Sequence, residues 1–350
     1  MKRLTYISRF SRDLSPAEIS KIGEISQRNN QRDQITGVLL CFNQIFFQIL
    51  EGEETKIEKV YEKILVDHRH TDILCLKMEN DIPERMFPDW DMKVIILDED
   101  EDLLIQPIKA LLKTLIESHR ILEKYTQSTI LKIISNGVNP LTVSPQKLDR
   151  IILFCDIFSF STIAEHLPGE DVVNLVNQFL SSCTNLITAR GGEVTKFMGD
   201  CIMAYFDGQE GDAALEASLN ILAEMELLRN SAPAKSPLKI LYSGIGLARG
   251  SVIEGNIGAG VKMDYTVIGD AVNAASRLES LTREFPYFLI FSEEVKESTQ
   301  SPWQFIHIGE VQAKGKEKPI SIYSLHDPVT AKPATEMLRA KIKNYLAGEI

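Results

Sequence analysis

The chain alternates short apolar segments with amphipathic ones in two long stretches, and this alternation limits its fold more than any other feature. The first stretch runs from Leu4 to about Leu97, and the second from about Lys147 to about Leu325. Apolar runs of about four to eight residues predict strands, whereas apolar residues every three or four positions predict helices. The sequence therefore predicts two α+β domains, each a sheet covered by helices.

Each stretch contains a hairpin between helical segments. In the first stretch the expected strands are Leu4–Ser8, Gly37–Phe42, Ile45–Leu50, Ile73–Lys77 and Met92–Leu97, and the expected helices are Pro16–Asn30 and Glu54–Asp67. In the second stretch the expected strands are Ile151–Cys155, Glu193–Phe197, Cys201–Phe206 and Leu238–Ala248, and the expected helices are Glu170–Thr188, Ala213–Arg229 and Gly269–Leu281. A last amphipathic helix is expected over Ala334–Leu346.

Between the two stretches lies a helix whose apolar residues follow heptad spacing. The seam positions are Ile105, Ile108, Leu112, Leu115, His119 and Leu122, and Leu111 widens the apolar face. Such a seam predicts pairing with the same helix of a second chain. The alternative is an amphipathic helix that packs on its own domain.

Charge and composition exclude several classes of protein. The formal net charge of −11 argues against a general nucleic-acid-binding surface. No early apolar run is long enough for a membrane span, and the first strand begins without a signal segment, so we expect a cytoplasmic protein without a membrane partner. The five cysteines are scattered without a CxxC pair, which favours buried free thiols over zinc ligands or disulfides.

Two aspartates of the second stretch, Asp156 and Asp200, lie at a strand end and at a hairpin tip. A carboxylate at the end of a buried strand is costly unless a cation meets it. Mg²⁺ takes few protein ligands and completes its shell with phosphate oxygens and water. The pair therefore suggests magnesium. The alternative is that Asp156 caps a helix near Ser159 and that Asp200 only makes a turn.

Three segments of the second stretch resemble the signature blocks of class III nucleotide cyclases, in the order of that family. They are Leu153–Ser161 (LFCDIFSFS), Gly191–Asp200 (GGEVTKFMGD) and Asp264–Glu279 (DYTVIGDAVNAASRLE). The resemblance implies an α/β cyclase domain with a ferredoxin-like core. Ser159, Ser161 and Ser276 depart from the more usual glycine, threonine and alanine.

The resemblance implies roles for residues of these blocks. Two Mg²⁺ ions, which Mn²⁺ could replace, are expected on Asp156, Asp200 and the carbonyl of Ile157, where they would activate the ribose 3′-hydroxyl and bind the triphosphate. Asn273 and Arg277, one helical turn apart, would orient the ribose and stabilise charge on the α-phosphate. The alternative is that both are surface polar residues of their helix.

The resemblance also implies the substrate and the assembly. Lys196 and Thr266 align with the pair that reads the purine, and a lysine with a hydroxyl favours adenine over guanine. Lys314 matches the family's triphosphate-binding lysine. Because a site of this family combines residues from two domains, we expect a homodimer with two equivalent ATP sites.

The first stretch has no glycine-rich phosphate loop, but it carries polar residues on apolar elements: Tyr6, Asn30 and Gln48. A buried amide without partners costs about 1–3 kcal/mol, so Gln48 would need them inside the domain. Taken singly, Tyr6 could be a core tyrosine and Gln48 an outward-facing strand residue.

Together with Thr36–Leu40, Gln48–Gly52 and Met86–Met92, these residues resemble the BLUF family of flavin-binding blue-light sensors over about residues 2–97. The resemblance implies a ferredoxin-like domain that holds the flavin ring between its two helices. The residues expected around the flavin are Tyr6, Asn30, Gln48, Asp67, Arg69, His70 and Met92.

The BLUF resemblance further implies how light acts. Tyr6 would give an electron and then a proton to the flavin, and Gln48 would end in a new tautomer or orientation. Trp90 and Met92 would carry the change onward. Asn29 stands where some relatives have a basic residue, so the sequence leaves the choice between FAD and FMN open.

The two resemblances together imply a photoactivated adenylyl cyclase that converts ATP into 3′,5′-cyclic AMP and pyrophosphate. We expect a BLUF domain over residues 1–98, a linker with the heptad helix over 99–146, a cyclase domain over 147–326 and a tail over 327–350. The alternatives are a light-regulated guanylyl cyclase, a catalytically silent nucleotide-binding module, and a constitutive cyclase whose flavin domain senses redox state or acts as a scaffold.

Overall fold

The computed structural model describes residues 1–97, 105–136, 138–260, 262–312 and 319–349. The chain forms two compact units, which are residues 1–143 and 144–350. Among the described helices, none has both the length and the apolar character needed to span a membrane.

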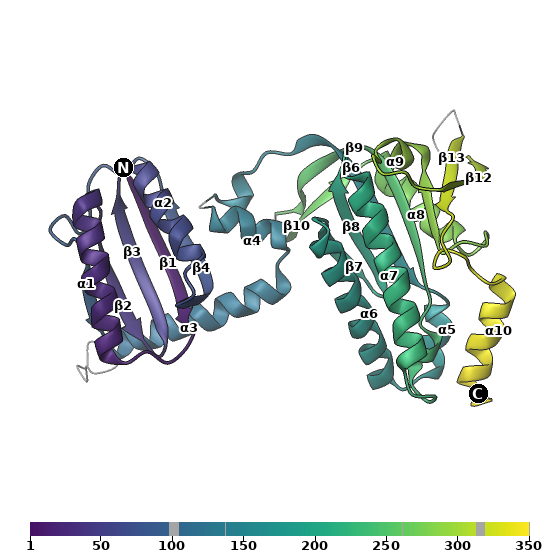
Figure 1. Ribbon diagram of the computed structural model, residues 1–350, viewed down its shortest axis with the longest axis horizontal. Coiled ribbons are helices and arrows are strands. Elements are labelled where there is room, and N and C mark those ends of the chain that lie inside the picture. The colour runs from purple at the N-terminus through teal and green to yellow at the C-terminus, as the bar shows by residue number, and fades with distance from the viewer. Residues whose placement is uncertain (98–104, 137, 261, 313–318, 350) are drawn as a thin grey trace. The chain divides into compact units, whose positions relative to one another are not determined.

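Within these ranges, the first unit contains a five-stranded sheet in the order β4-β1-β3-β2-β5. Figure 1 shows β4, β1, β3 and β2 of this sheet. Its strands are β1 (Lys2–Phe10), β2 (Thr36–Phe42), β3 (Ile45–Gly52), β4 (His70–Glu79) and β5 (Lys93–Ile96). Its helices are α1 (Pro16–Asp33), α2 (Glu54–Leu65), α3 (Ile105–Tyr125), α4 (Ser128–Ser135) and the 3₁₀ turn η1 (Pro140–Thr142). Neighbouring strands are antiparallel except β2 and β5. Strands β1 to β4 with α1 and α2 follow the βαββαβ order of a ferredoxin-like fold, as expected.

Helices α1 and α2 cover one face of this sheet. α1 begins at Ser15, which forms a capping box with Glu18. Ile19 of α1 and Ile57 of α2 are buried in one core with residues of the strands, such as Leu39. Since successive strand residues point to opposite faces, every second residue of β1 and β3 lies beneath these helices.

Helix α3 contributes to the packing of its own unit. Leu112 is buried in a small cluster with Phe42 and Leu97. Leu112 therefore packs on its own domain, which is the alternative given for this helix in the sequence analysis. Three other seam residues are exposed in the single chain, namely Ile108, Leu115 and Leu122. The side chains of Ile105 and His119 lie outside the described residues. Pairing of this helix with a second copy stays a prediction.

Within the described residues, the second unit is built on an eight-stranded sheet (Figure 1). The order is β12-β13-β11-β9-β6-β8-β7, and β10 pairs with β9. Its strands are β6 (Gln146–Ile157), β7 (Glu193–Met198), β8 (Cys201–Asp207), β9 (Ser243–Ala259), β10 (Lys262–Ile268), β11 (Leu289–Ser292), β12 (Phe305–Val311) and β13 (Ile320–Leu325). Its helical segments are α5 (Phe160–His166), α6 (Gly169–Ala189), α7 (Gly211–Ser231), η2 (Pro237–Ile240), α8 (Asp270–Leu281), α9 (Glu293–Glu297) and α10 (Thr335–Leu346). The strands β9-β6-β8-β7 are antiparallel and repeat the ferredoxin-like order.

Helices cover both faces of the second sheet. On one face, Phe179 of α6 packs in a core that includes Leu153 of β6, and α10 adds Leu338 to the same core. On the other face, Ala275 of α8 packs in a core that includes Phe154. The cysteines are free thiols, and four of the five are buried, as predicted.

The prediction of a strand over Leu238–Ala248 is wrong for its first residues. Ser236 caps a 3₁₀ turn that begins with Pro237, and its side chain accepts a hydrogen bond from the backbone N–H of Leu238. Proline has no N–H to give to a strand ladder, so this apolar run turns instead of pairing. β9 begins only at Ser243, and it continues to Ala259 because β6 and β10 both pair with it.

Close packing of α8 on β9 gives a stability prediction. A Cβ atom at Gly246 would lie 2.1 Å from the backbone N of Glu279 and 2.4 Å from the carbonyl O of Ala275. Because α8 would have to move, we expect Gly246→Ala to lower the free energy of unfolding of the second unit by about 3 kcal/mol. Urea unfolding followed by Trp303 fluorescence, in a Trp90→Phe background, measures this.

Gly169 supplies the matched control, because a Cβ there meets no atom within 4 Å. Gly169→Ala should change stability by less than about 0.5 kcal/mol. Equal effects of the two substitutions would contradict the packing argument.

Candidate functional site

The first unit encloses a cavity of about 460 Å³ between α1, α2 and the sheet. All seven residues expected around a flavin line it: Tyr6, Asn30, Gln48, Asp67, Arg69, His70 and Met92. Trp90, expected in signalling, is not among the lining residues. Its ring instead stacks on Phe87, with centroids 5.0 Å apart.

Tyr6 and Gln48 form a buried polar pair at the inner end of this cavity. They lie directly opposite each other in the β1–β3 ladder, and both are almost fully buried. The Tyr6 hydroxyl donates to Gln48 Oε1, and Gln48 Nε2 donates to Met92 Sδ at 3.4 Å. Gln48 is therefore not an outward-facing strand residue. Burial raises the pKa of Tyr6 well above its usual value, so the hydroxyl stays protonated.

A second polar group lies where α2 leads into β4. Arg69 bonds to Asp67, with Nε 2.9 Å from Oδ1, and holds the pKa of Asp67 at about 2. His70 Nδ1 lies 2.7 Å from Ser8 Oγ. Burial lowers the pKa of His70, so the imidazole beside the cavity is neutral near pH 7.

Basic side chains line the mouth of the cavity, and the sequence alone did not single out two of them. Arg32 and Lys63 lie in the last turns of α1 and α2, are exposed, and line the cavity together with exposed Arg69. Arg32 pairs with Asp33 and Arg69 pairs with Asp67, and both aspartates also line the cavity. Three cations against two carboxylates leave one excess positive charge at the mouth, whereas the inner end is neutral and polar. This distribution fits a flavin nucleotide, which joins a neutral ring to a phosphate.

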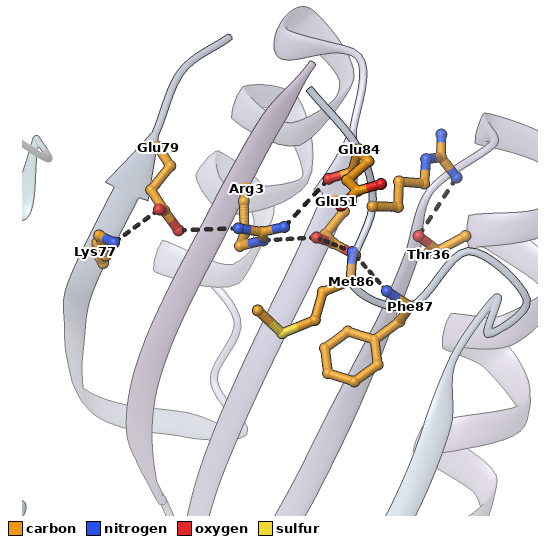
Figure 2. Close-up of polar contacts among 9 residues, drawn as sticks. Arg3, Thr36, Glu51, Lys77, Glu79, Glu84, Met86 and Phe87 are labelled. Atoms are coloured by element: carbon orange, nitrogen blue, oxygen red, sulfur yellow. Dashed lines mark hydrogen bonds and ion pairs between the residues drawn. The ribbon is translucent and has the colours of Figure 1, made fainter. Parts of the chain in front are cut away.

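A buried carboxylate, that of Glu51, binds the backbone of the segment that leads to Trp90 and Met92. Figure 2 shows its contacts with Arg3, Met86 and Phe87. Glu51 is fully buried and accepts hydrogen bonds from the backbone N–H groups of Met86 and Phe87, each at 2.9 Å. Arg3 Nε also donates to it, at 2.6 Å. Pairing with a cation and two backbone donors compensates the burial of this charge.

In the second unit, Asp156 and Asp200 meet at one end of the central strands. Met198 pairs with Cys201, which leaves Gly199 and Asp200 as a two-residue turn, and Gly199 permits it with a φ of 70°. The backbone N–H of Ile157 donates to Asp200 Oδ2 at 3.3 Å. Burial and the neighbouring Asp156 raise the pKa of Asp200 to about 8.

Arg283 and Glu279 lie beside these two aspartates, and the sequence alone did not indicate a role for either. Arg283 Nη2 donates to Asp156 Oδ2 at 2.9 Å, and Arg283 also pairs with Glu279. Burial raises the pKa of Glu279 to about 7. Asp156 Oδ1 is buried and has no hydrogen-bond partner in the described part of the chain.

Three carboxyl groups thus face one guanidinium, and an orphaned oxygen remains. Because the pKa of Asp200 is raised to about 8 and that of Glu279 to about 7, protons occupy part of this acidic cluster near pH 7. Divalent cations would displace these protons and balance the charge, so the residues fit metal ions. Among the described residues, no three histidine, cysteine or acidic side chains form a ready metal cage. Substrate phosphates would therefore have to complete the coordination.

The two residues expected at the α-phosphate lie away from Asp156 in the same chain. Asn273 and Arg277 are exposed on α8, whereas Arg283, which contacts Asp156, follows the end of that helix. At about 1.5 Å per residue, Asn273 lies roughly 15 Å from Arg283 along the helix direction. Lys314 falls outside the described residues.

Thr266 lies still further from the acidic cluster. Asp156 pairs with Gly244 of β9, and Thr266 of β10 pairs with Gly255, eleven positions along the same strand. At about 3.3 Å per residue this is roughly 36 Å of extended chain, more than one nucleotide spans. Thr266 Oγ1 is buried without a partner in the described part, and Lys196 is half-buried in β7. One chain therefore does not bring the predicted site residues together.

Comparisons with known proteins agree with both halves of this description. Residues 1–93 match the family model of sensors of blue-light using FAD, and residues 143–327 match that of adenylate and guanylate cyclase catalytic domains. A solved bacterial light-regulated adenylyl cyclase is 53% identical, with a TM-score of 0.92 over 99% of both chains.

Two curated relatives are more distant. The photoactivated adenylate cyclase subunit beta of Euglena longa is 33% identical over 296 residues, which are 83% of this chain and 34% of that protein. The adenylate cyclase of Anabaena cylindrica is 32% identical over 211 residues, which are 58% of this chain and 42% of that protein. The chain thus spans about a third of the length of the Euglena protein.

The Glu51 contacts give a prediction for the first unit. Glu51→Ala removes the buried acceptor of Arg3 Nε and of the Met86 and Phe87 N–H groups, so we expect a loss of about 3–5 kcal/mol in the free energy of unfolding. Trp90 fluorescence during urea unfolding, in a Trp303→Phe background, measures this. Glu79 is the control, since it also pairs with Arg3 but is partly exposed. Glu79→Ala should cost less than about 1 kcal/mol, and equal losses would refute the role given to Glu51.

Proposed function

The chain belongs to the family of class III adenylyl cyclases that carry a BLUF domain, and we infer that it converts ATP into 3′,5′-cyclic AMP and pyrophosphate under the control of blue light. The observation that carries the catalytic part is the juxtaposition of Asp156 and Asp200, with an Oδ1 on Asp156 that is buried and has no hydrogen-bond partner among the described residues. The observation that carries the sensory part is the Tyr6–Gln48 pair at the inner end of a ligand-sized cavity.

The proposed domains are a BLUF domain over residues 1–98, a linker over 99–146, a cyclase domain over 147–326 and a tail over 327–350. BLUF domains bind flavin, and in this chain Asn30 and Gln48 would face the ring. Arg32 and Lys63 at the cavity mouth suit the phosphate of either FAD or FMN. When bound, the flavin supplies light absorption and accepts an electron.

The response to light would lie in the hydrogen bonds of Tyr6 and Gln48. Tyr6 is the proposed donor of an electron and then of the proton that it now shares with Gln48 Oε1. A new tautomer or orientation of Gln48 changes what its amide offers to Met92 Sδ. Phe47, the neighbour of Gln48 in β3, points to the opposite face and packs with the cluster that includes Leu112 of α3. This contact is a route from the cavity to the linker helix.

Class III cyclases use divalent metal ions, and in this chain Asp156, Asp200 and the carbonyl of Ile157 are the proposed ligands of two Mg²⁺ or Mn²⁺ ions. When bound, the ions favour deprotonation of the ribose 3′-hydroxyl and neutralise the triphosphate. Asn273 would orient the ribose, and Arg277 would stabilise the charge that develops on the α-phosphate.

The remaining substrate contacts would come from Lys196, Thr266 and Lys314. Thr266 Oγ1, which has no hydrogen-bond partner in the described ranges, can bond to the base, with Lys196 as the second residue that reads adenine. Lys314 would bind the triphosphate. A light-regulated guanylyl cyclase is the rival enzyme, and a silent nucleotide-binding module is the non-enzymatic rival.

Cyclase domains of this class act as dimers and bind ATP. We propose a homodimer in which Asp156 and Asp200 of one chain face Asn273 and Arg277 of the other. The separation of Asp156 from Thr266 along β9 within one chain supports this arrangement. The exposed apolar residues of α3 would add to the contact between the chains, with Ile108, Leu111, Leu115 and Leu122 facing the second copy.

The function is tested with protein purified in darkness. We expect cyclic AMP formation from ATP and Mg²⁺ to rise by at least tenfold under blue light, together with a small red shift of the flavin band. GTP should give little product, and EDTA should abolish turnover. Equal rates in dark and light would remove the sensory role, whereas binding of ATP without turnover would favour the silent module.

Tyr6 provides the matched test of the sensory step. Tyr6→Phe removes the only hydroxyl of that side chain, so the ratio of light to dark rates should fall toward one. Tyr61 lies 6.1 Å from Tyr6 between ring centroids, yet it is not among the residues that line the cavity. Tyr61→Phe should keep the light response, and loss of the response in both variants would point to misfolding instead.

Mixing two inactive variants tests the shared site. Asp156→Ala and Arg277→Ala should each abolish activity as homodimers. In a 1:1 mixture about half of the dimers are mixed, and each has one intact site of two, so we expect about a quarter of the unmodified rate. No recovery after subunit exchange, with dimer formation verified by light scattering, would contradict the two-chain site.

A further inference from the structure

The second unit contains a cavity of about 470 Å³ that none of the proposed catalytic residues line. Three cationic side chains from three separate elements face it. Arg229 comes from the end of α7, Lys239 from η2 and Lys341 from α10. Its size is within the range of small-molecule sites.

These three cations bond only to neutral oxygens in the described part of the chain. Arg229 Nη1 donates to the carbonyl of Leu241 at 2.7 Å, and Lys341 Nζ donates to the Tyr242 hydroxyl at 2.8 Å. Lys239 Nζ lies 3.4 Å from the carbonyl O of Asn230. By contrast, four arginines of this unit pair with carboxylates, namely Arg150, Arg190, Arg249 and Arg283.

The local charge is positive although the whole chain carries −11. Glu226 is the one acidic side chain among the lining residues, and it faces three cations. Arg229 is partly buried, with its guanidinium 4.1 Å from the centre of the Tyr242 ring, and burial lowers its pKa. Keeping a desolvated cation without a carboxylate is costly, and an anion would remove that cost.

We propose that this cavity is a binding site for a small oligophosphate, either inorganic or the phosphate chain of a nucleotide. The Arg229 guanidinium can donate hydrogen bonds to two phosphate oxygens, and the lysines act as point charges on the others. Such a ligand would bridge α7, η2 and α10, and so would fix the C-terminal helix on the unit. The proposal goes beyond cyclase activity, because it concerns a second anion site.

Binding of a ligand at this cavity can be measured separately from catalysis. The Tyr242 carbonyl accepts a bond from the Phe158 N–H, close to Asp156, so binding must be separated from the metal site. Calorimetric titration of the full chain with pyrophosphate in EDTA does this. We expect saturable binding that Lys341→Ala weakens at least tenfold. Lys343→Ala is the control, since Lys343 is exposed on the same helix and does not line the cavity.

A second variant and a second readout keep the test decisive. Lys239→Ala should weaken binding similarly, and pyrophosphate should slow hydrogen exchange of α10. Comparing pyrophosphate with ADP identifies the source, because equal affinities indicate an inorganic ligand and tighter ADP binding indicates a nucleotide. Absence of binding at millimolar pyrophosphate would overturn the proposal. So would an equal loss in the Lys343→Ala variant, since that result indicates general charge attraction.

Discussion

The second unit depends on holding Asp156 and Asp200 close together where neither charge is well solvated. β6 is paired on both sides, by β8 and β9, so the position of Asp156 is fixed. The turn at Gly199 then brings Asp200 to it. Arg283 neutralises part of the charge and ties the end of α8 to the same point. The repulsion that remains favours a cation at this point, which the proposed metal ions would supply.

The first unit also holds two buried polar side chains in contact, but both of them are neutral. Tyr6 and Gln48 lie opposite each other on the helix-covered face of the sheet, and each satisfies the other. Because only one acceptor and one donor of the amide are used by Tyr6 and Met92, a change of orientation exchanges bonds without a large movement. Glu51 keeps the loop of Met92 in register with the sheet.

Within one chain, the acidic cluster and Thr266 are far apart, and this separation bears on the function as much as the contacts do. The acidic cluster lies near the start of β9, whereas Thr266 pairs near its other end. A rigid paired strand cannot fold back to join them. Under the proposed function, a second chain would therefore supply one of the two sets of residues, and the contact between the two copies would be the place where activity is controlled.

The sequence by itself determined the two βαββαβ patterns and the heptad spacing, which follow from local periodicity. Seven of the residues that line the flavin-sized cavity came from the BLUF resemblance, not from periodicity, because they are spread along the chain from Tyr6 to Met92. The sequence also located Asp156 and Asp200, because charges at the ends of apolar strands are conspicuous.

Only the tertiary structure decided which charges meet. Arg283 reaches Asp156 across 127 positions of sequence, and Arg3 reaches Glu51 across 48. It also decided that Leu112 packs inward and that Leu238–Ile240 turns instead of pairing. Local patterns fix which face of an element is apolar, but partners distant in sequence are set by how the elements pack, and no short-range pattern records that.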